Sequence, residues 1–360
     1  MIGTIRANST YDLLATWRSQ TSDLQNKLNT ISQEVATGKK ADVYRSLGFQ
    51  SSEVLALRMQ MDRNDDYITT NEMLASKMDF TNATLGSIRS VTQDFLDLAI
   101  PNVNSPTQTA AKLQQAAANT LEQLTGLLNT TFQNTAIFAG VDNGKLPMQK
   151  WDTVNASTGL SPNDVLASII GGGPIDGVDA AQKVSALKEI FSSTNTTNPD
   201  QNFEATFFNG SPLLQAGGVE TPRLQSQIDK NTTLTYGIQA NDPEFTELMR
   251  GLAMIATIDV SKIDNPEAYQ TWMSDAVSAV SNGVSGVIKT EAQLGAQQQT
   301  VDERISAQRS LGDLYNTRIS NLEGVDLYEA SSQLLLLENQ LQATYTVTSR
   351  LSKLSILNYL

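Results

Sequence analysis

The chain contains no cysteine and no histidine among its 360 residues. It therefore cannot form disulfides, Cys- or His-ligated zinc sites, a cysteine nucleophile or a Ser-His-Asp triad. Aromatic residues make up only 6% of the sequence. The apolar content is mostly Leu, Ala, Ile, Val and Met, which suits helix packing better than an aromatic-lined pocket. The composition thus favours a helical protein with little catalytic repertoire.

Basic residues are also scarce, and the formal net charge is −13. Nucleic-acid binding needs clustered Lys and Arg, and an anionic membrane surface attracts the same residues, so both partners are disfavoured. The first residues lack the apolar run and small-residue cleavage site of a signal peptide. No apolar run approaches the ~20 residues that span a bilayer. We therefore expect no membrane insertion, and either a cytosolic location or export without a cleaved signal.

Both ends of the chain carry narrow apolar stripes at alternating spacings of three and four, a pattern typical of coiled-coil seams. A stripe this narrow cannot cover a globular core. We therefore expect the two terminal helices to lie side by side or to meet copies of themselves, with ordinary packing within the domain as the alternative. The candidate subunit-interaction residues of the N-terminal seam are Leu14, Trp17, Leu24, Leu28, Ile31 and Val35. Those of the C-terminal seam are Leu334, Leu337, Leu341, Leu351 and Leu354.

The inner parts of the chain repeat this helical pattern. Residues 51–100 and 107–138 predict a hairpin of two long helices, separated by two prolines. Residues 244–258 and 267–321 predict the returning helices, each with a proline near its start.

The middle of the chain differs in composition, because residues 141–240 hold ten of the 22 glycines and six of the ten prolines. Runs such as NFEATFFNG and TLTYGIQA predict strands or hairpin arms, and SPNDVLASII and AAQKVSALKEIF predict short helices. We therefore predict a mainly α fold with a mixed α/β outer domain inserted in its middle. The predicted divisions are a terminal coiled-coil inner domain (1–40 plus 322–360), a helical rod domain (41–140 plus 241–321) and the outer domain (141–240).

Motifs for chemistry are incomplete. Gly171–Pro174 is glycine-rich but lacks the Lys and Ser/Thr of a phosphate loop. Asp142–Gly144 and Asp176–Asp179 lack the alternating acidic ligands and terminal Glu of a calcium loop, so they predict Asx turns. Nothing singles out one carboxylate pair for glycoside hydrolysis. The sequence predicts no enzymatic activity, no cofactor and no metal site.

Three stretches carry a family resemblance: NTAIFAGVDNGKLP at 134–147, VATGKKADV at 35–43, and the tail VDLYEASSQLLLLENQLQATYTVTSRLSKLSILNYL at 325–360. They resemble the flagellin superfamily of bacterial flagellar proteins. Within it they are more similar to the hook-filament junction family, hook-associated protein 3, than to filament flagellin. Phe138, Ala139 and Gly140 match that family's turn from the second inner helix into the outer domain. VYRSLGFQSSEV stands where the family often has an Asp-Asp-Pro element.

The resemblance implies a structural subunit of the bacterial flagellum, an adaptor that polymerises through its terminal helices. It implies export through the flagellar type III channel to the cell exterior. The implied partners are copies of itself, the neighbouring hook-associated protein, flagellin and a cytosolic secretion chaperone. One alternative is a filament flagellin. An alternative of another class is a surface module whose insert binds a glycan or a receptor.

Overall fold

A computed structural model describes residues 6–215 and 217–357, with side chains described from 15 to 350 within these ranges. Helices dominate, and the only described sheets within these ranges are two small two-stranded ones in the middle of the chain. The predicted mainly α fold with long terminal helices is therefore confirmed. The chain divides into two compact units, one formed by residues up to 66 and from 307 onward, the other by residues 67–306.

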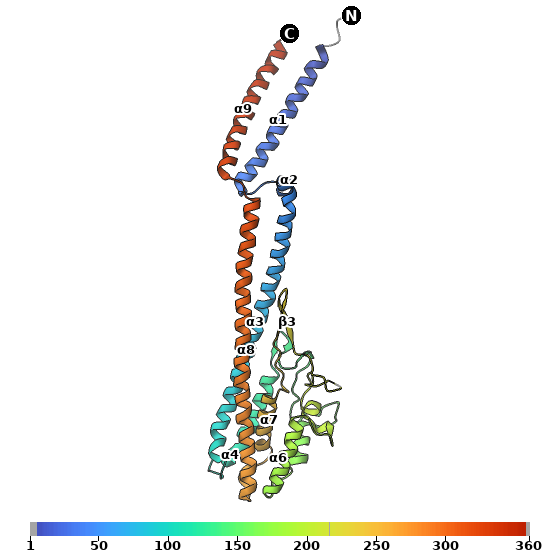
Figure 1. Cartoon of the computed structure of the whole chain (residues 1–360), viewed down its shortest axis with the longest axis vertical. Coiled ribbons are helices and arrows are strands. Elements are labelled where there is room, and N and C mark those ends of the chain that lie inside the picture. The colour runs from blue at the N-terminus through green and yellow to red at the C-terminus, as the bar shows by residue number, and fades with distance from the viewer. Residues whose placement is uncertain (1–5, 216, 358–360) are drawn as a thin grey trace. The chain divides into compact units, whose positions relative to one another are not determined.

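The first unit contains the two terminal helices, which run side by side in Figure 1 and contact each other along their length. Its elements are α1 (Arg6–Thr37), α2 (Val43–Leu47), η1 (Gly48–Gln50), the start of α3 (Ser51–Ala99), the end of α8 (Pro266–Glu323) and α9 (Leu327–Leu357). α1 ends where Gly38 adopts a positive φ of 68°, a conformation that stops a helix. Asp42 then caps α2 by accepting a hydrogen bond from the Arg45 backbone N–H at 3.0 Å.

The second unit holds the remaining elements. They are the rest of α3 and α8, η2 (Ile100–Asn102), α4 (Ala110–Leu128), β1 (Thr131–Phe132), β2 (Thr135–Ala136), α5 (Pro162–Ile170), α6 (Gly177–Phe191), η3 (Pro199–Gln201), η4 (Phe203–Phe207), β3 (Gln225–Asp229), β4 (Thr232–Thr235), α7 (Pro243–Ala256) and η5 (Val260–Lys262). The predicted helices at 51–100, 244–258 and 267–321 correspond to α3, α7 and α8, so these predictions are confirmed.

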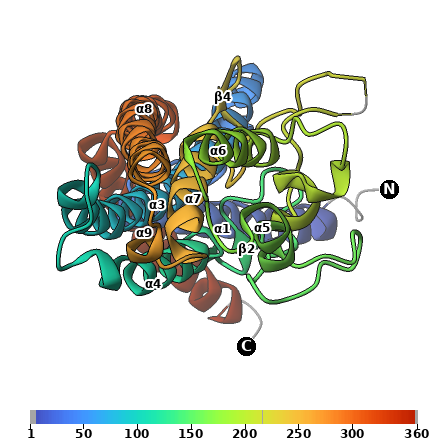
Figure 2. The ribbon, with the colours of Figure 1, turned by 90° about the horizontal axis from the view of Figure 1, so that it is seen from below.

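One continuous apolar core fills the second unit and includes residues of both the long helices and the middle segment. Figure 2 shows α7 lying among α4, α6 and α8. Each of these helices, and α3, contributes fully buried side chains, for example Leu85, Leu124, Ile190, Leu252 and Trp272. Burial of side chains of this size stabilises a fold by roughly 1.5–3 kcal/mol each, so this core dominates the stability of the unit.

Two local predictions were wrong. The helix expected to run to residue 138 ends at Leu128, and β1 and β2 follow it as an antiparallel hairpin. Gln133 and Asn134 both have positive φ in the tight turn, a conformation that a helix cannot contain. The run NFEATFFNG forms the π-helical turn η4 rather than a strand. A helical turn lets Phe203 and Phe207 stack in the core at 5.5 Å between ring centroids.

The second hairpin, β3 and β4, supplies the strand character expected around TLTYGIQA. Its register pairs Ser226 with Leu234 and Gln227 with Thr233, with an irregularity after Gln227. The two predicted short helices are present as α5 and α6, and Ser161 caps the first in a reciprocal capping box with Asp164.

Candidate assembly surface and domain junction

The terminal stripes meet each other within the chain. On α1 the seam residues Trp17, Leu24, Leu28, Ile31 and Val35 are half-buried, while most of their neighbours are exposed. On α9 the half-buried positions include Leu334, Leu337 and Leu341. Gln25 Nε2 donates a hydrogen bond to the Tyr345 hydroxyl at 2.6 Å across the pair. Leu14 lies in α1, and Leu351 and Leu354 lie in α9, but their side chains are outside the described part of the structure.

Apolar side chains remain uncovered beside the seam. Leu335 and Leu336 on α9 are 61% and 57% exposed, because they lie between seam positions and point away from α1. Tyr328 at the start of α9 is 85% exposed, and Phe49 in η1 is 90% exposed. Exposed apolar side chains that gather on one surface are typical of interaction sites, so these residues are candidates for one. This exposed apolar surface could have been predicted from the unbroken run of four leucines at 334–337, because only Leu334 and Leu337 belong to the seam.

A polar cluster around Glu323, which we call the Glu323 clasp, joins the segment after α1 to the end of α8 in the first unit. The Glu323 side chain is 1% exposed and pairs with Arg58 at 2.5 Å and with Lys39 at 3.6 Å. Its backbone oxygen accepts the Lys40 N–H at 2.8 Å, and Lys39 bridges Gly324 as an isolated β pair. The clasp ties the segment after α1 to the segment before α9. The apolar periodicity does not predict this cluster.

The predicted junction turn lies in the second unit, where the chain enters and leaves the middle segment. Phe138 is fully buried, with its ring edge-on to Phe245 at 5.7 Å between centroids. Ala139 forms an antiparallel bridge with Gln239, and its oxygen accepts the Ser211 N–H at 2.9 Å. Gly140 has a φ of 74°, the left-handed conformation that glycine adopts without strain, and it follows the hairpin rather than a helix.

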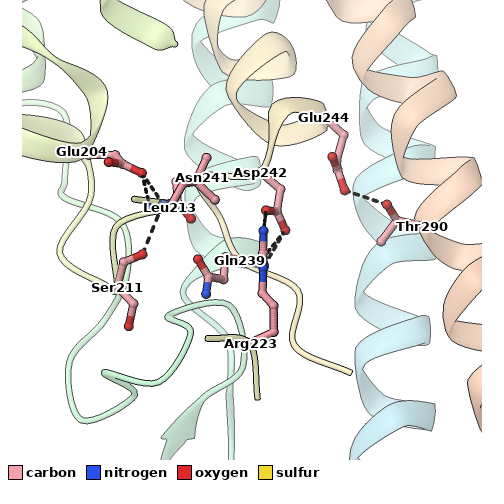
Figure 3. Close-up of polar contacts among 9 residues, drawn as sticks. All are labelled: Glu204, Ser211, Leu213, Arg223, Gln239, Asn241, Asp242, Glu244 and Thr290. Atoms are coloured by element: carbon pink, nitrogen blue, oxygen red, sulfur yellow. Dashed lines mark hydrogen bonds and ion pairs between the residues drawn. The ribbon is translucent and has the colours of Figure 1, made fainter. Parts of the chain in front are cut away.

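Charged side chains brace this junction, as Figure 3 shows. Arg223 donates to both carboxylate oxygens of Asp242, at 2.6 and 3.1 Å, and Asp242 accepts the Gln239 backbone N–H at 2.8 Å. Glu204 accepts hydrogen bonds from the Asn241 side chain at 2.6 Å and from the Leu213 backbone at 2.7 Å. Two-pronged arginine pairs of this kind are stronger and more directional than single contacts. The sequence analysis missed these residues, since they are far apart in the chain and belong to no motif.

The geometry described so far defines a class of protein. In the first unit, two long helices from opposite ends of the chain pair along a narrow seam and leave apolar side chains uncovered. In the second unit, a braced junction attaches the middle segment. This is the organisation of a helical structural subunit built to contact other chains. None of the described helices is long and apolar enough to cross a membrane.

Comparison with known families identifies the subunit more closely. Residues 9–143 match the bacterial flagellin N-terminal helical region, and residues 277–360 match the bacterial flagellin C-terminal helical region. The two regions together cover more than half of the chain, which belongs to the bacterial flagellin superfamily. A search among curated proteins found no match. Flagellins are structural, non-enzymatic proteins that are exported and polymerise into the flagellum outside the cell.

Proposed function

We propose that this flagellar subunit is the adaptor at the hook-filament junction. The observation that carries the proposal is the stretch 134–147, which resembles the junction family and forms the braced turn around Phe138, Ala139 and Gly140. The Thr37–Lys40 turn and the tail from 352 to 360 add to the same resemblance. An adaptor couples a bending hook to a stiffer filament, so its role is mechanical and needs no cofactor.

The terminal helices are the proposed means of polymerisation. Each seam side chain that the structure describes is only half-buried, so further area is open to a neighbouring subunit. Leu335, Leu336 and Tyr328 add uncovered apolar surface on α9. We take the contact to be heterologous, because a head-to-tail contact builds a helical layer whereas an isologous contact closes a dimer. The proposed interaction set includes the described seam residues together with Leu14, Leu351 and Leu354.

The proposed partners follow from this position in the flagellum. Copies of the chain form the layer, a neighbouring hook-associated protein borders it on the hook side, and flagellin borders it on the filament side. A cytosolic chaperone binds the C-terminal segment before export through the flagellar type III channel.

Deletion of the coding sequence tests the proposal. A junction subunit is needed to seat the filament, so the mutant is expected to keep hooks, lose filaments and release unassembled flagellin into the medium. Complementation with the full chain restores filaments. Release of intact hooks without secreted flagellin would contradict the junction role.

Filament flagellin is the second candidate, because the two matched regions are described for flagellins as a whole. If this chain were the only flagellin, its deletion would leave hooks and no filament protein to secrete. The composition of the culture medium therefore separates the two functions in a single strain.

A further inference from the structure

Lys77 on α3 is a half-buried lysine without a carboxylate partner. Other partly buried cations of the second unit, such as Arg250 and Arg223, pair with carboxylates. The Lys77 ammonium forms no ion pair or hydrogen bond with any residue that the structure describes, and it lies over the Tyr236 ring, whose centroid is 5.4 Å from Nζ. A cation over an aromatic face gains some attraction, but it keeps its hydrogen-bond donors unused.

The ammonium lies at a pocket between α3 and the two hairpins. The pocket encloses about 260 Å³ and is lined by Lys77, Phe132, Gln133, Thr135, Ser226 and Tyr236 among others. Phe132 holds the first hairpin against α3 by packing on Phe80, with 5.6 Å between ring centroids. The pocket is therefore a feature of packed elements and not of a single loop.

The lining offers donors in addition to the ammonium. Among the described residues, the hydroxyls of Thr135, Ser226 and Tyr236 have no hydrogen-bond partner. Burial raises the pKa of the Tyr236 hydroxyl, which therefore stays protonated and able to donate. Burial also lowers the pKa of the Lys77 ammonium, because no carboxylate compensates for the water that it loses.

We propose that this pocket receives the carboxylate of an aspartate or glutamate from a second copy of the chain. One ammonium and several neutral donors match the single charge and four acceptor positions of a carboxylate. A doubly charged phosphate would lack a second cation among the lining residues. The chain itself carries 38 acidic against 25 basic residues, so every neighbouring copy presents a surplus of carboxylates.

The inference rests on the proposed function only in requiring that copies of the chain lie side by side. It adds a contact in the second unit to the terminal-helix contacts, and the added contact is electrostatic and directional. Such a contact fixes the orientation of a neighbouring subunit, whereas an apolar seam permits sliding.

Zero-length cross-linking is the direct test. Unlabelled and ¹⁵N-labelled full-length chains are mixed, assembled and treated with a carbodiimide, which joins an amine only to a carboxylate in contact with it. The expected product is an amide between Lys77 of one isotope and an Asp or Glu of the other, present in the assembly and absent from dilute monomer. Assembled chains that carry no intermolecular amide at Lys77 would overturn the inference.

A substitution series gives the second measurement. Lys77→Met keeps the unbranched part of the side chain and removes the ammonium with its charge. Lys112→Met is the control, because Lys112 is an exposed lysine on α4. A lost charge-assisted hydrogen bond to a partner raises the concentration required for assembly about tenfold. Lys112→Met is expected to leave that concentration unchanged. The melting temperature of monomeric Lys77→Met is not expected to fall, which separates a contact role from a folding role.

Three outcomes separate the possible failures. If wild-type copies assemble and Lys77→Met assembles at the same concentration, this inference is wrong and the proposed function stands. If wild-type copies never associate, self-assembly itself is refuted, and the inference is refuted with it. If sodium acetate protects Lys77 from chemical acetylation in the monomer while Lys77→Met assembles normally, the pocket binds small acids and not a second copy.

Discussion

The Glu323 clasp yields the sharpest stability prediction. Replacing Glu323 by alanine removes the pairs with Arg58 and Lys39 but leaves the backbone bond from Lys40 to the Glu323 oxygen in place. The perturbation is therefore confined to the carboxylate. The substitution affects the contact between the segment that follows α1 and the segment that precedes α9.

The expected magnitude follows from exposure. Loss of one partner from a fully buried pair costs about 3–5 kcal/mol, because the other charge remains buried and alone. Here the Arg58 and Lys39 side chains are 47% and 58% exposed, so water solvates both once Glu323 is gone. The remaining cost is that of a charged hydrogen bond and a small cavity, about 1.5–3 kcal/mol.

Hydrogen exchange measured by mass spectrometry on the full-length chain provides the assay. A loss of this size speeds exchange at the backbone amides of 38–40 and 324–330 by roughly 10- to 150-fold, since each 1.4 kcal/mol corresponds to a factor of ten. Glu53→Ala is the matched control, because Glu53 pairs with Arg318 on the surface, with exposures of 42% and 58%. A surface pair of this kind contributes at most about 1 kcal/mol.

Equal exchange rates for Glu323→Ala and Glu53→Ala at residues 38–40 and 324–330 would contradict the role of the Glu323 clasp. The role is also contradicted if Glu323→Ala accelerates exchange only in residues 67–306, which the clasp does not contact.

Three further predictions concern the second unit. Gly140→Ala should lower the free energy of unfolding, measured by urea titration, by about 2–4 kcal/mol. The φ of Gly140 is 74°, and an added Cβ would lie 2.5 Å from a buried glutamine side chain. Gly144 has open space around it, so Gly144→Ala should change the free energy of unfolding by less than ~0.5 kcal/mol. Ser161→Ala should cost about 1 kcal/mol, as for other lost helix caps. Hydrogen bonds from Ser161 lower the pKa of Asp164, so their stabilisation is present above its ordinary pKa of 3.8 and should be lost on acidification through the lowered value, as seen by exchange in α5. Lys77→Met should raise the free energy of unfolding of the monomer at neutral pH. The lowered pKa of the wild-type Lys77 ammonium makes wild-type stability rise with pH up to the unfolded pKa of 10.5. The gain from the substitution should therefore shrink as alkaline titration neutralises that ammonium.

The sequence predicted features that depend on local chemistry. The seam period identified α1 and α9, because side-chain spacing acts within a few residues. The hairpin at 131–136 was missed because Thr131 and Thr135 also fit a helical stripe. Only the turn residues distinguish the two structures.

The sequence did not predict features that depend on distant partners. Arg223 pairs with Asp242, and Glu323 with Arg58, through contacts set by tertiary packing. The Lys77 pocket needs α3 and both hairpins in place before an unpaired ammonium can be recognised. No spacing rule relates such residues to one another.

The central claim is that this chain is a flagellar subunit located at the hook-filament junction. Immunogold electron microscopy of isolated flagella, with the label on this chain, tests it most directly. Label is expected in one short band at the boundary between hook and filament. Label along the whole filament would contradict the junction role and assign the chain to the filament instead.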